Sequence, residues 1–220
     1  MKTGSNEFAV LPSQVRLHSS IEFHLTGFGS FKEVDVNPSS ILVKKLEEGL
    51  KEKPIPGVII GTTRVLEVEP KACIKGVESI LEAIEIKKNP DTKYAIIHFG
   101  VARSRSNFTI EAKGYNKDNF SMKPNVIPII KDITCGHSIE TIIPYTAITT
   151  NLQHLGFSVD ISTDPGSYLC NYIYYVSLYK TLPSHIPSLF VHIPKFDFVP
   201  EAKQVEFAYE LLKEFKRSYL

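Results

Sequence analysis

Residues 158–194, SVDISTDPGSYLCNYIYYVSLYKTLPSHIPSLFVHIP, decide the fold class. Residues 158–163 predict a strand and 164–167 predict a Pro-Gly turn. Residues 168–181 predict a helix, and the apolar run 188–194 is typical of a strand buried on both faces. A strand, a helix and a strand in this order indicate an α/β fold.

The same alternation extends over most of the chain. Strands are expected within residues 21–26, 57–68, 93–100 and 106–116, and helices within 37–52, 69–87, 143–157 and 200–217. Residues 117–137 are rich in Lys, Asn, Asp, Pro and Gly and are expected to be irregular. We therefore predict a three-layer α/β/α sandwich around a mixed, largely parallel sheet. One domain is expected over residues 21–220, after an N-terminal extension of residues 1–20 for which flexibility is expected.

Bulk composition excludes several classes of function. The chain has 220 residues, 43% of them hydrophobic, and a formal net charge of +1, with no basic stripe. Binding to nucleic acid or to an anionic membrane is therefore not expected. Three widely spaced cysteines, and the absence of a signal-peptide core from the first 20 residues, favour a reducing, cytoplasmic location. The sequence has no H-E-x-x-H or C-x-x-C motif, so neither a metal nor a cofactor is expected.

Several distinctive residues follow predicted strands. In open α/β sheets the ligand crevice lies outside the carboxyl ends of the strands. The segment Gly27–Phe31, Gly100, Cys170 and His192 all occur at or after such an end. We expect them to share one crevice.

Cys170, His192 and Glu111 are candidates for chemistry, and each also has a structural explanation. A cysteine in the first turn of a helix is a poised nucleophile, because free backbone N–H groups favour its thiolate, but free cysteines are also common core residues. A histidine at a strand end is either a general base or a satisfied core side chain. A glutamate before an irregular loop either orients a histidine or lies on the surface.

Four sequence motifs in order resemble those of the pyroglutamyl peptidase I (pyrrolidone-carboxylate peptidase) family, in its eukaryotic type. They are TGFGSF with VNPS (residues 26–31 and 36–39), FTIEAKGYN (108–116), PGSYLCNYIYY (165–175) and FVHIP (190–194). The resemblance covers roughly residues 20–215. It implies a cysteine exopeptidase that removes N-terminal pyroglutamate from peptides through a thioacyl-enzyme intermediate.

The resemblance also implies roles for individual residues. Cys170 is expected to be the nucleophile, His192 its base, and Glu111 the residue that orients the histidine. Phe28, Phe31, Tyr168 and Leu169 are expected to surround the flat, uncharged lactam ring of the substrate. Core packing is the alternative role of the two phenylalanines. Asn37 is expected to cap or brace the Gly27–Phe31 loop.

Departures from the family pattern leave other functions open. Pro165 replaces the usual alanine, Ser30 replaces a proline, and residues 117–125 lack the D-A-R element of bacterial members. The main alternative is a non-catalytic relative that binds peptides. A transferase similar to the purine nucleoside phosphorylases is a second, supported by fold analogy alone. Small peptides with N-terminal pyroglutamate are the expected partners, and the chain is expected to be a monomer or a homo-oligomer.

Overall fold

The structure is a computed structural model that describes residues 20–31, 36–120 and 126–220. The predicted extension therefore lies outside the described residues, except for Ser20, which is the first residue of a strand. Within the described residues, every helix is too short or too polar to span a bilayer.

A mixed six-stranded sheet forms the centre of the molecule. Its strand order is β2-β1-β3-β8-β4-β7. Strands β2, β1, β3 and β8 are parallel to one another, whereas β4 runs antiparallel to β8 and parallel to β7. The bounds are β1 Ser20–Phe28, β2 Val58–Leu66, β3 Thr92–Val101, β4 Phe108–Glu111, β7 Val159–Ser162 and β8 Ser188–Ile193.

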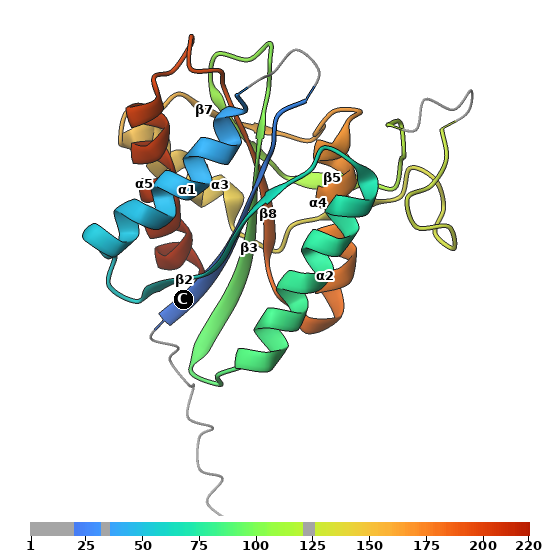
Figure 1. Cartoon of the computed structure of the whole chain (residues 1–220), viewed down its shortest axis with the longest axis horizontal. Helices are drawn as coiled ribbons and strands as arrows, with labels where there is room; N and C mark the ends of the chain where they lie inside the picture. The colour runs from blue at the N-terminus through green and yellow to red at the C-terminus, as the bar shows by residue number, and fades with distance from the viewer. Residues whose placement is uncertain (1–19, 32–35, 121–125) are drawn as a thin grey trace, which may run out of the picture.

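Helices cover both faces of the sheet (Figure 1). Helices α1 (Pro38–Glu52), α3 (Tyr145–His154) and α5 (Glu201–Tyr219) pack together on one face. Helices α2 (Pro70–Lys87) and α4 (Leu169–Thr181) pack against each other on the opposite face, and a short 3₁₀ turn, η1 (Leu182–Ser184), follows α4. The predicted three-layer α/β/α sandwich with a mixed, largely parallel sheet is confirmed.

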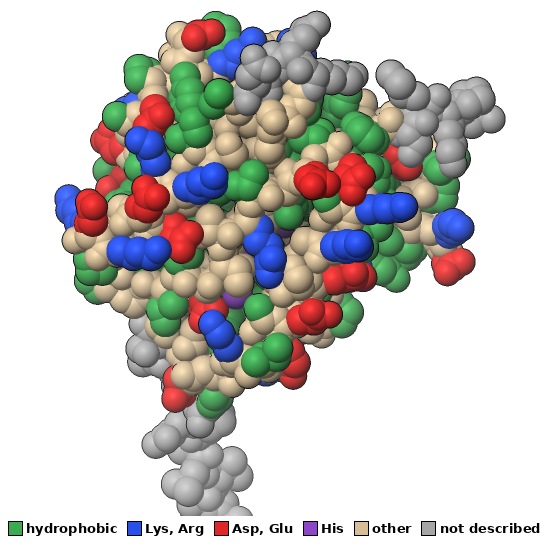
Figure 2. All heavy atoms as spheres, viewed as in Figure 1, with side chains coloured by type: hydrophobic (Ala, Val, Ile, Leu, Met, Phe, Trp, Pro, Cys, Tyr) green, Lys and Arg blue, Asp and Glu red, His purple; other side chains and the backbone are tan. Residues whose placement is uncertain are grey.

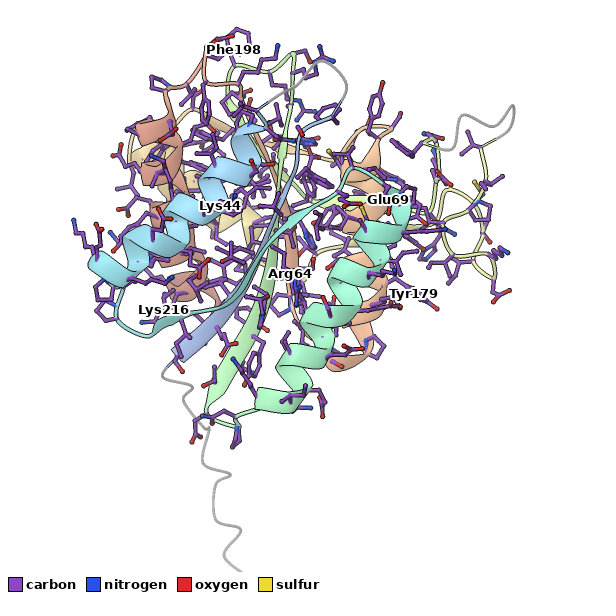
Figure 3. The ribbon with its side chains drawn as sticks, viewed as in Figure 1. Lys44, Arg64, Glu69, Tyr179, Phe198 and Lys216 are labelled. Atoms are coloured by element: carbon purple, nitrogen blue, oxygen red, sulfur yellow. The ribbon has the colours of Figure 1, made fainter. Side chains whose placement is uncertain are left out.

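The two faces of the sheet differ in polarity. Along β1, Ile21, Phe23 and Leu25 point toward α1 and α5, where they join a large apolar core. The intervening side chains lie on the α2 and α4 face, where His24 and Thr26 are fully buried. Figure 3 shows side chains filling the space on both sides of the sheet, with Arg64 of β2 between the sheet and α2. Along β1, the buried polar side chains thus face α2 and α4, and the apolar ones face α1 and α5.

One predicted strand is divided between two sheets. Residues 106–116 form β4 in the main sheet and then β5 (Lys113–Tyr115), which pairs with β6 (Ser138–Glu140) in a separate two-stranded sheet. Residues 57–68, within which strand structure was expected, contain the single strand β2. The other predicted helices and strands are confirmed with shifts of a few residues at their ends. Acidic and basic side chains are interspersed over the face drawn in Figure 2.

Candidate active site

Glu111 and His192 are diagonal neighbours on adjacent antiparallel strands. His192 of β8 lies opposite Thr109 of β4, and Glu111 lies opposite Phe190. Diagonal side chains on one face of such a pair are within reach of each other when they are long. The Glu111 Oε1 atom lies 2.8 Å from His192 Nδ1, and both side chains are buried. This hydrogen bond orients the imidazole and leaves its Nε2 atom for a second partner.

The second partner of His192 is Cys170. Burial alone lowers the pKa of His192, but the charge of Cys170 and a hydrogen bond to its side chain act in the opposite direction. The hydrogen bond and charge of Glu111 add to that effect, and together they raise the pKa of His192 from 6.5 to about 9. The imidazole of His192, between Cys170 and Glu111, is therefore positively charged at neutral pH.

Cys170 lies in the first turn of α4. The helix begins at Leu169, one residue after the predicted start, so Cys170 is its second residue. The first N–H groups of a helix have no partner within the helix and carry a partial positive charge. The side chain of Cys170 is half-buried and packs against the edge of the apolar cluster under α4. It is thus not a wholly buried core residue, which was the alternative explanation of this cysteine.

Gly100 provides the space that the thiol occupies. It pairs with His192 across β3 and β8. A β-carbon at position 100 would lie 3.2 Å from Cys170 Sγ and 2.7 Å from the Phe190 ring. The sulfur therefore lies over the glycine, next to His192 on the side away from β4. The order across the sheet is thiol, imidazole, carboxylate.

Two aromatic side chains, Phe190 and Tyr174, contact His192 and Glu111. The Phe190 ring lies 4.8 Å from that of His192, measured between centroids. The Tyr174 hydroxyl, which is fully buried, donates a hydrogen bond of 2.7 Å to the backbone carbonyl of Glu111. The ring of His192 thus contacts a side chain of β8, Phe190, and the backbone of Glu111 is held by a side chain of α4, Tyr174.

Sequence reasoning missed a residue that contacts Glu111. Arg105, in the loop between β3 and β4, places Nη1 3.3 Å from Glu111 Oε1. No periodicity or motif marked it, because loop conformation alone brings it there. It precedes Glu111 by only six positions, which is the one sequence signal that was present.

Asn171, the residue after the cysteine, was also missed. Its side chain accepts a hydrogen bond of 2.8 Å from the N–H of Tyr115 and donates one of 2.9 Å to the carbonyl of Tyr115. A further contact of 3.2 Å reaches the carbonyl of Lys117. These bonds attach the start of α4 to β5.

Across residues 20–31, 36–120 and 126–220, no three His, Cys, Asp or Glu side chains are grouped so that they could hold a metal ion.

Comparison with known proteins identifies the family of this chain. A family model described as pyroglutamyl peptidase matches residues 22–206, a range that includes the loop after β1 and all of Glu111, Cys170 and His192. The chain belongs to the pyroglutamyl peptidase family. The resemblance seen in the four motifs is confirmed.

Curated relatives support the membership over similar lengths. Human pyroglutamyl-peptidase 1 is 34% identical over 178 residues, which are 77% of this chain and 77% of that protein. The pyrrolidone-carboxylate peptidase of Pyrococcus furiosus is 30% identical over 186 residues, 80% of this chain and 81% of that protein. The similarity therefore extends across most of both chains.

Solved structures of pyrrolidone carboxyl peptidases share the fold. A mutant of the Pyrococcus furiosus protein superposes with a TM-score of 0.75 at 24% identity, covering 90% of this chain and 100% of that one. The Thermococcus litoralis protein gives a TM-score of 0.72 at 22% identity, covering 89% and 93%. The fold of this pyroglutamyl peptidase family member is thus the one seen in those proteins.

The loop after β1 is braced by polar side chains. Asn37 caps α1 by accepting a hydrogen bond from the N–H of Ser39 and donates one of 3.0 Å to the carbonyl of Gly29. Ser39 Oγ accepts a hydrogen bond of 3.0 Å from the N–H of Phe28. The bracing role expected of Asn37 is confirmed.

The residues expected to surround the substrate differ in exposure. Phe28 and Leu169 are buried and belong to the same apolar cluster that Cys170 packs against. Phe31 is half-buried, and Tyr168 is 67% exposed directly before α4. Contact of these four side chains with a substrate remains a prediction.

Proposed function

We propose that this pyroglutamyl peptidase family member is a cysteine exopeptidase that cleaves the amide bond after an N-terminal pyroglutamyl residue. In this proposal Cys170 is the nucleophile, His192 the general base and acid, and Glu111 the orienting carboxylate. The single observation that carries it is the position of the His192 imidazole, which interacts with Cys170 and lies 2.8 Å from Glu111. That is the arrangement a thiol nucleophile requires.

The first step is attack of the Cys170 thiolate on the pyroglutamyl carbonyl carbon. A carbon–sulfur bond forms, and the carbonyl electrons move onto oxygen to give a tetrahedral oxyanion. The N–H of Cys170 at the start of α4 is the first donor we assign to that oxyanion, because the opening N–H groups of a helix point outward without helical partners. His192, charged beside the thiolate, holds the proton needed next.

Collapse of this intermediate releases the peptide. His192 donates its proton to the leaving nitrogen, the carbon–nitrogen bond breaks, and a thioacyl-enzyme remains. His192 then accepts a proton from water, which attacks the thioester carbonyl. Breaking of the carbon–sulfur bond yields free pyroglutamate and regenerates Cys170. Atoms and charges balance with water as the only co-reactant.

Specificity for a blocked N-terminus follows from the chemistry of the lactam. Its ring is flat and uncharged, with one donor and one acceptor. Phe28, Phe31, Tyr168 and Leu169 are the side chains we assign to the ring, and backbone groups would read its N–H and C=O. A charged α-amine would lose its hydration against these side chains with no compensating partner, so ordinary peptides are rejected.

The non-catalytic, peptide-binding alternative is not favoured by the family membership. It was motivated by Pro165 and by residues 117–125, of which 121–125 lie outside the described residues. The phosphorylase-like alternative has no observation in its favour. We also propose that residues 21–220 form one catalytic domain. We propose a cytoplasmic location as well, which is supported by the three cysteines, all of them free of disulfides.

Hydrolysis of pyroglutamyl-aminomethylcoumarin tests the function. The wild type is expected to release the fluorophore and to leave alanyl-aminomethylcoumarin intact. Cys170→Ala is expected to lose this activity, while Cys135→Ala, which changes an exposed cysteine outside the site, retains it. Full activity in Cys170→Ala contradicts the assigned nucleophile. A wild type that binds the substrate without turnover restores the peptide-binding alternative.

A further inference from the structure

Arg105 lies next to the row formed by Cys170, His192 and Glu111, but it is not one of the three residues to which the proposed mechanism assigns a role. Its backbone N–H donates to the carbonyl of Ala102 within the short loop that follows Val101, the last residue of β3. From there its Nη1 atom reaches within 3.3 Å of Glu111 Oε1. The side chain of Arg105 is 35% exposed, whereas that of Glu111 is fully buried.

The Glu111 carboxylate depends on few partners. Oε1 accepts from both His192 Nδ1 and Arg105 Nη1, at 2.8 and 3.3 Å. Oε2 is buried and has no hydrogen-bond partner among the described residues. A buried charge is costly unless it is paired, and removing one partner leaves much of that cost in place. Without Arg105, His192 would be the sole hydrogen-bonding partner of the carboxylate within the described chain.

We propose that Arg105 is a positioning residue for catalysis, which holds the Glu111 carboxylate in register with His192 and completes the charge balance of the site. The inference rests on the proposed peptidase function. It adds a fourth member, acting through Glu111, to the row of Cys170, His192 and Glu111.

Charge counting supports this role. In the reactive state the thiolate and the carboxylate each carry one negative charge, and the imidazolium of His192 carries one positive charge. The Arg105 guanidinium supplies the second positive charge, so the four groups sum to zero. Loss of Arg105 leaves a net negative charge in a largely buried site. The carboxylate then gains by rotating its oxygens toward solvent, which misaligns the imidazole.

The backbone of Glu111 is held independently of this contact. The Tyr174 hydroxyl binds the Glu111 carbonyl at 2.7 Å, and β4 is hydrogen-bonded on both sides, to β8 and to β7. Removal of Arg105 therefore leaves the strand in place and affects only the carboxylate. Because Arg105 acts through Glu111 and is not among the residues assigned to the lactam ring, its loss should lower kcat and leave KM almost unchanged.

Three variants separate this role from a structural one. Arg105→Ala removes the cation, Arg105→Gln keeps an N–H donor without charge, and Arg217→Gln removes an exposed arginine that pairs with the largely buried Glu214 of α5. With pyroglutamyl-aminomethylcoumarin we expect kcat of both position-105 variants to fall roughly 10- to 100-fold, as for a misplaced catalytic group. KM should stay within about twofold of the wild-type value, as is also expected for Arg217→Gln.

Chemical rescue provides the second readout. Guanidinium ion at low millimolar concentration, far below denaturing levels, is expected to restore part of kcat in Arg105→Ala and to leave the wild type unchanged. If Arg105→Ala does not fold, as judged by thermal unfolding, Arg105→Gln is used in its place for kcat and KM.

The outcomes distinguish this inference from the proposed function. Wild-type kcat in Arg105→Ala and Arg105→Gln, with Cys170→Ala inactive, overturns the role of Arg105 alone. A lowered kcat with no response to guanidinium, together with a raised KM, marks a merely structural loop residue and also overturns it. An inactive wild type contradicts the peptidase function itself.

Discussion

The Cys170 thiol lies directly over Gly100, the strand residue beside His192. A β-carbon at position 100 would approach Sγ to 3.2 Å and the Phe190 ring to 2.7 Å, so only glycine leaves room for both. The pairing of Gly100 with His192 then fixes the sulfur next to the imidazole. The absence of a side chain at position 100 is therefore required for the sulfur of Cys170 to lie next to His192.

Gly100→Ala is expected to displace either the sulfur or the Phe190 ring beneath His192. Adding a methyl group to a packed interior costs about 1–3 kcal/mol of unfolding free energy. A shift of about 1 Å in the nucleophile lowers kcat by roughly 10²-fold. Urea unfolding and steady-state kinetics check the two effects separately. An active, stable alanine variant would show that the thiol does not need this space.

Glu111→Gln is expected to keep the shape of the carboxyl group and remove its charge. Because the hydrogen bond and charge of Glu111 are among the causes that raise the pKa of His192 to about 9, that pKa should fall. Loss of the orienting charge should lower kcat by roughly 10²- to 10⁴-fold. Kinetics and the pH profile of kcat/KM measure this. Unchanged kinetics would remove Glu111 from the mechanism.

Cys170→Ala is expected to change the titration of His192. The charge and hydrogen bond of Cys170 are the largest of the effects that raise its pKa, and burial opposes them. NMR titration should place His192 near pH 9 in the wild type and substantially lower in the variant. A raised folded pKa stabilises the fold fully below the unfolded value of 6.5, and that stabilisation is lost as pH rises through about 9. Equal titration in both proteins would mean that thiol and imidazole are not coupled.

Two other histidines are expected to make the fold sensitive to acid. Burial lowers the pKa of His98 to about 3. Burial, followed by the charges of Lys87 and Arg64, lowers that of His24 to about 4. Both stay neutral in the fold, so the stability they contribute is present above pH 6.5 and is lost as pH falls toward these values.

The expected slope is up to about 1.4 kcal/mol per pH unit for each histidine below pH 6.5. His98→Gln retains a partner for the Thr26 hydroxyl, which lies 2.7 Å from His98 Nδ1, but does not titrate. Urea unfolding between pH 7 and pH 4 should therefore show a shallower loss of stability in this variant. The same slope as in the wild type would mean that His98 is not buried as a neutral group.

Asn171→Ala is expected to loosen the start of α4. It removes the hydrogen bonds to the N–H and carbonyl of Tyr115 and to the carbonyl of Lys117. Each buried group left without a partner costs about 1–3 kcal/mol. The melting temperature and kcat should both fall, because Cys170 is the preceding residue. A fall in stability with an unchanged kcat would show that Cys170 is held by other contacts.

Local signals account for most of the helices and strands. At the start of α1, Asn37 and Pro38 specify a cap and a first turn through contacts within a few residues. The division of residues 106–116 was not predictable in this way. Strand β5 pairs with β6, about 25 residues later, and a pattern read along the chain contains no information on that partner.

The sequence by itself determined the α/β class, the family, and the order of a glutamate, a cysteine and a histidine along the chain, since periodicity and motifs are local properties. Only the tertiary structure decided that β4 runs antiparallel beside β8, which makes Glu111 and His192 diagonal neighbours. It alone brought the sulfur over Gly100 and the guanidinium of Arg105 to the carboxylate. These contacts depend on strand pairing and loop closure across long separations, where the energy of the whole sheet rather than of any one segment selects the partner.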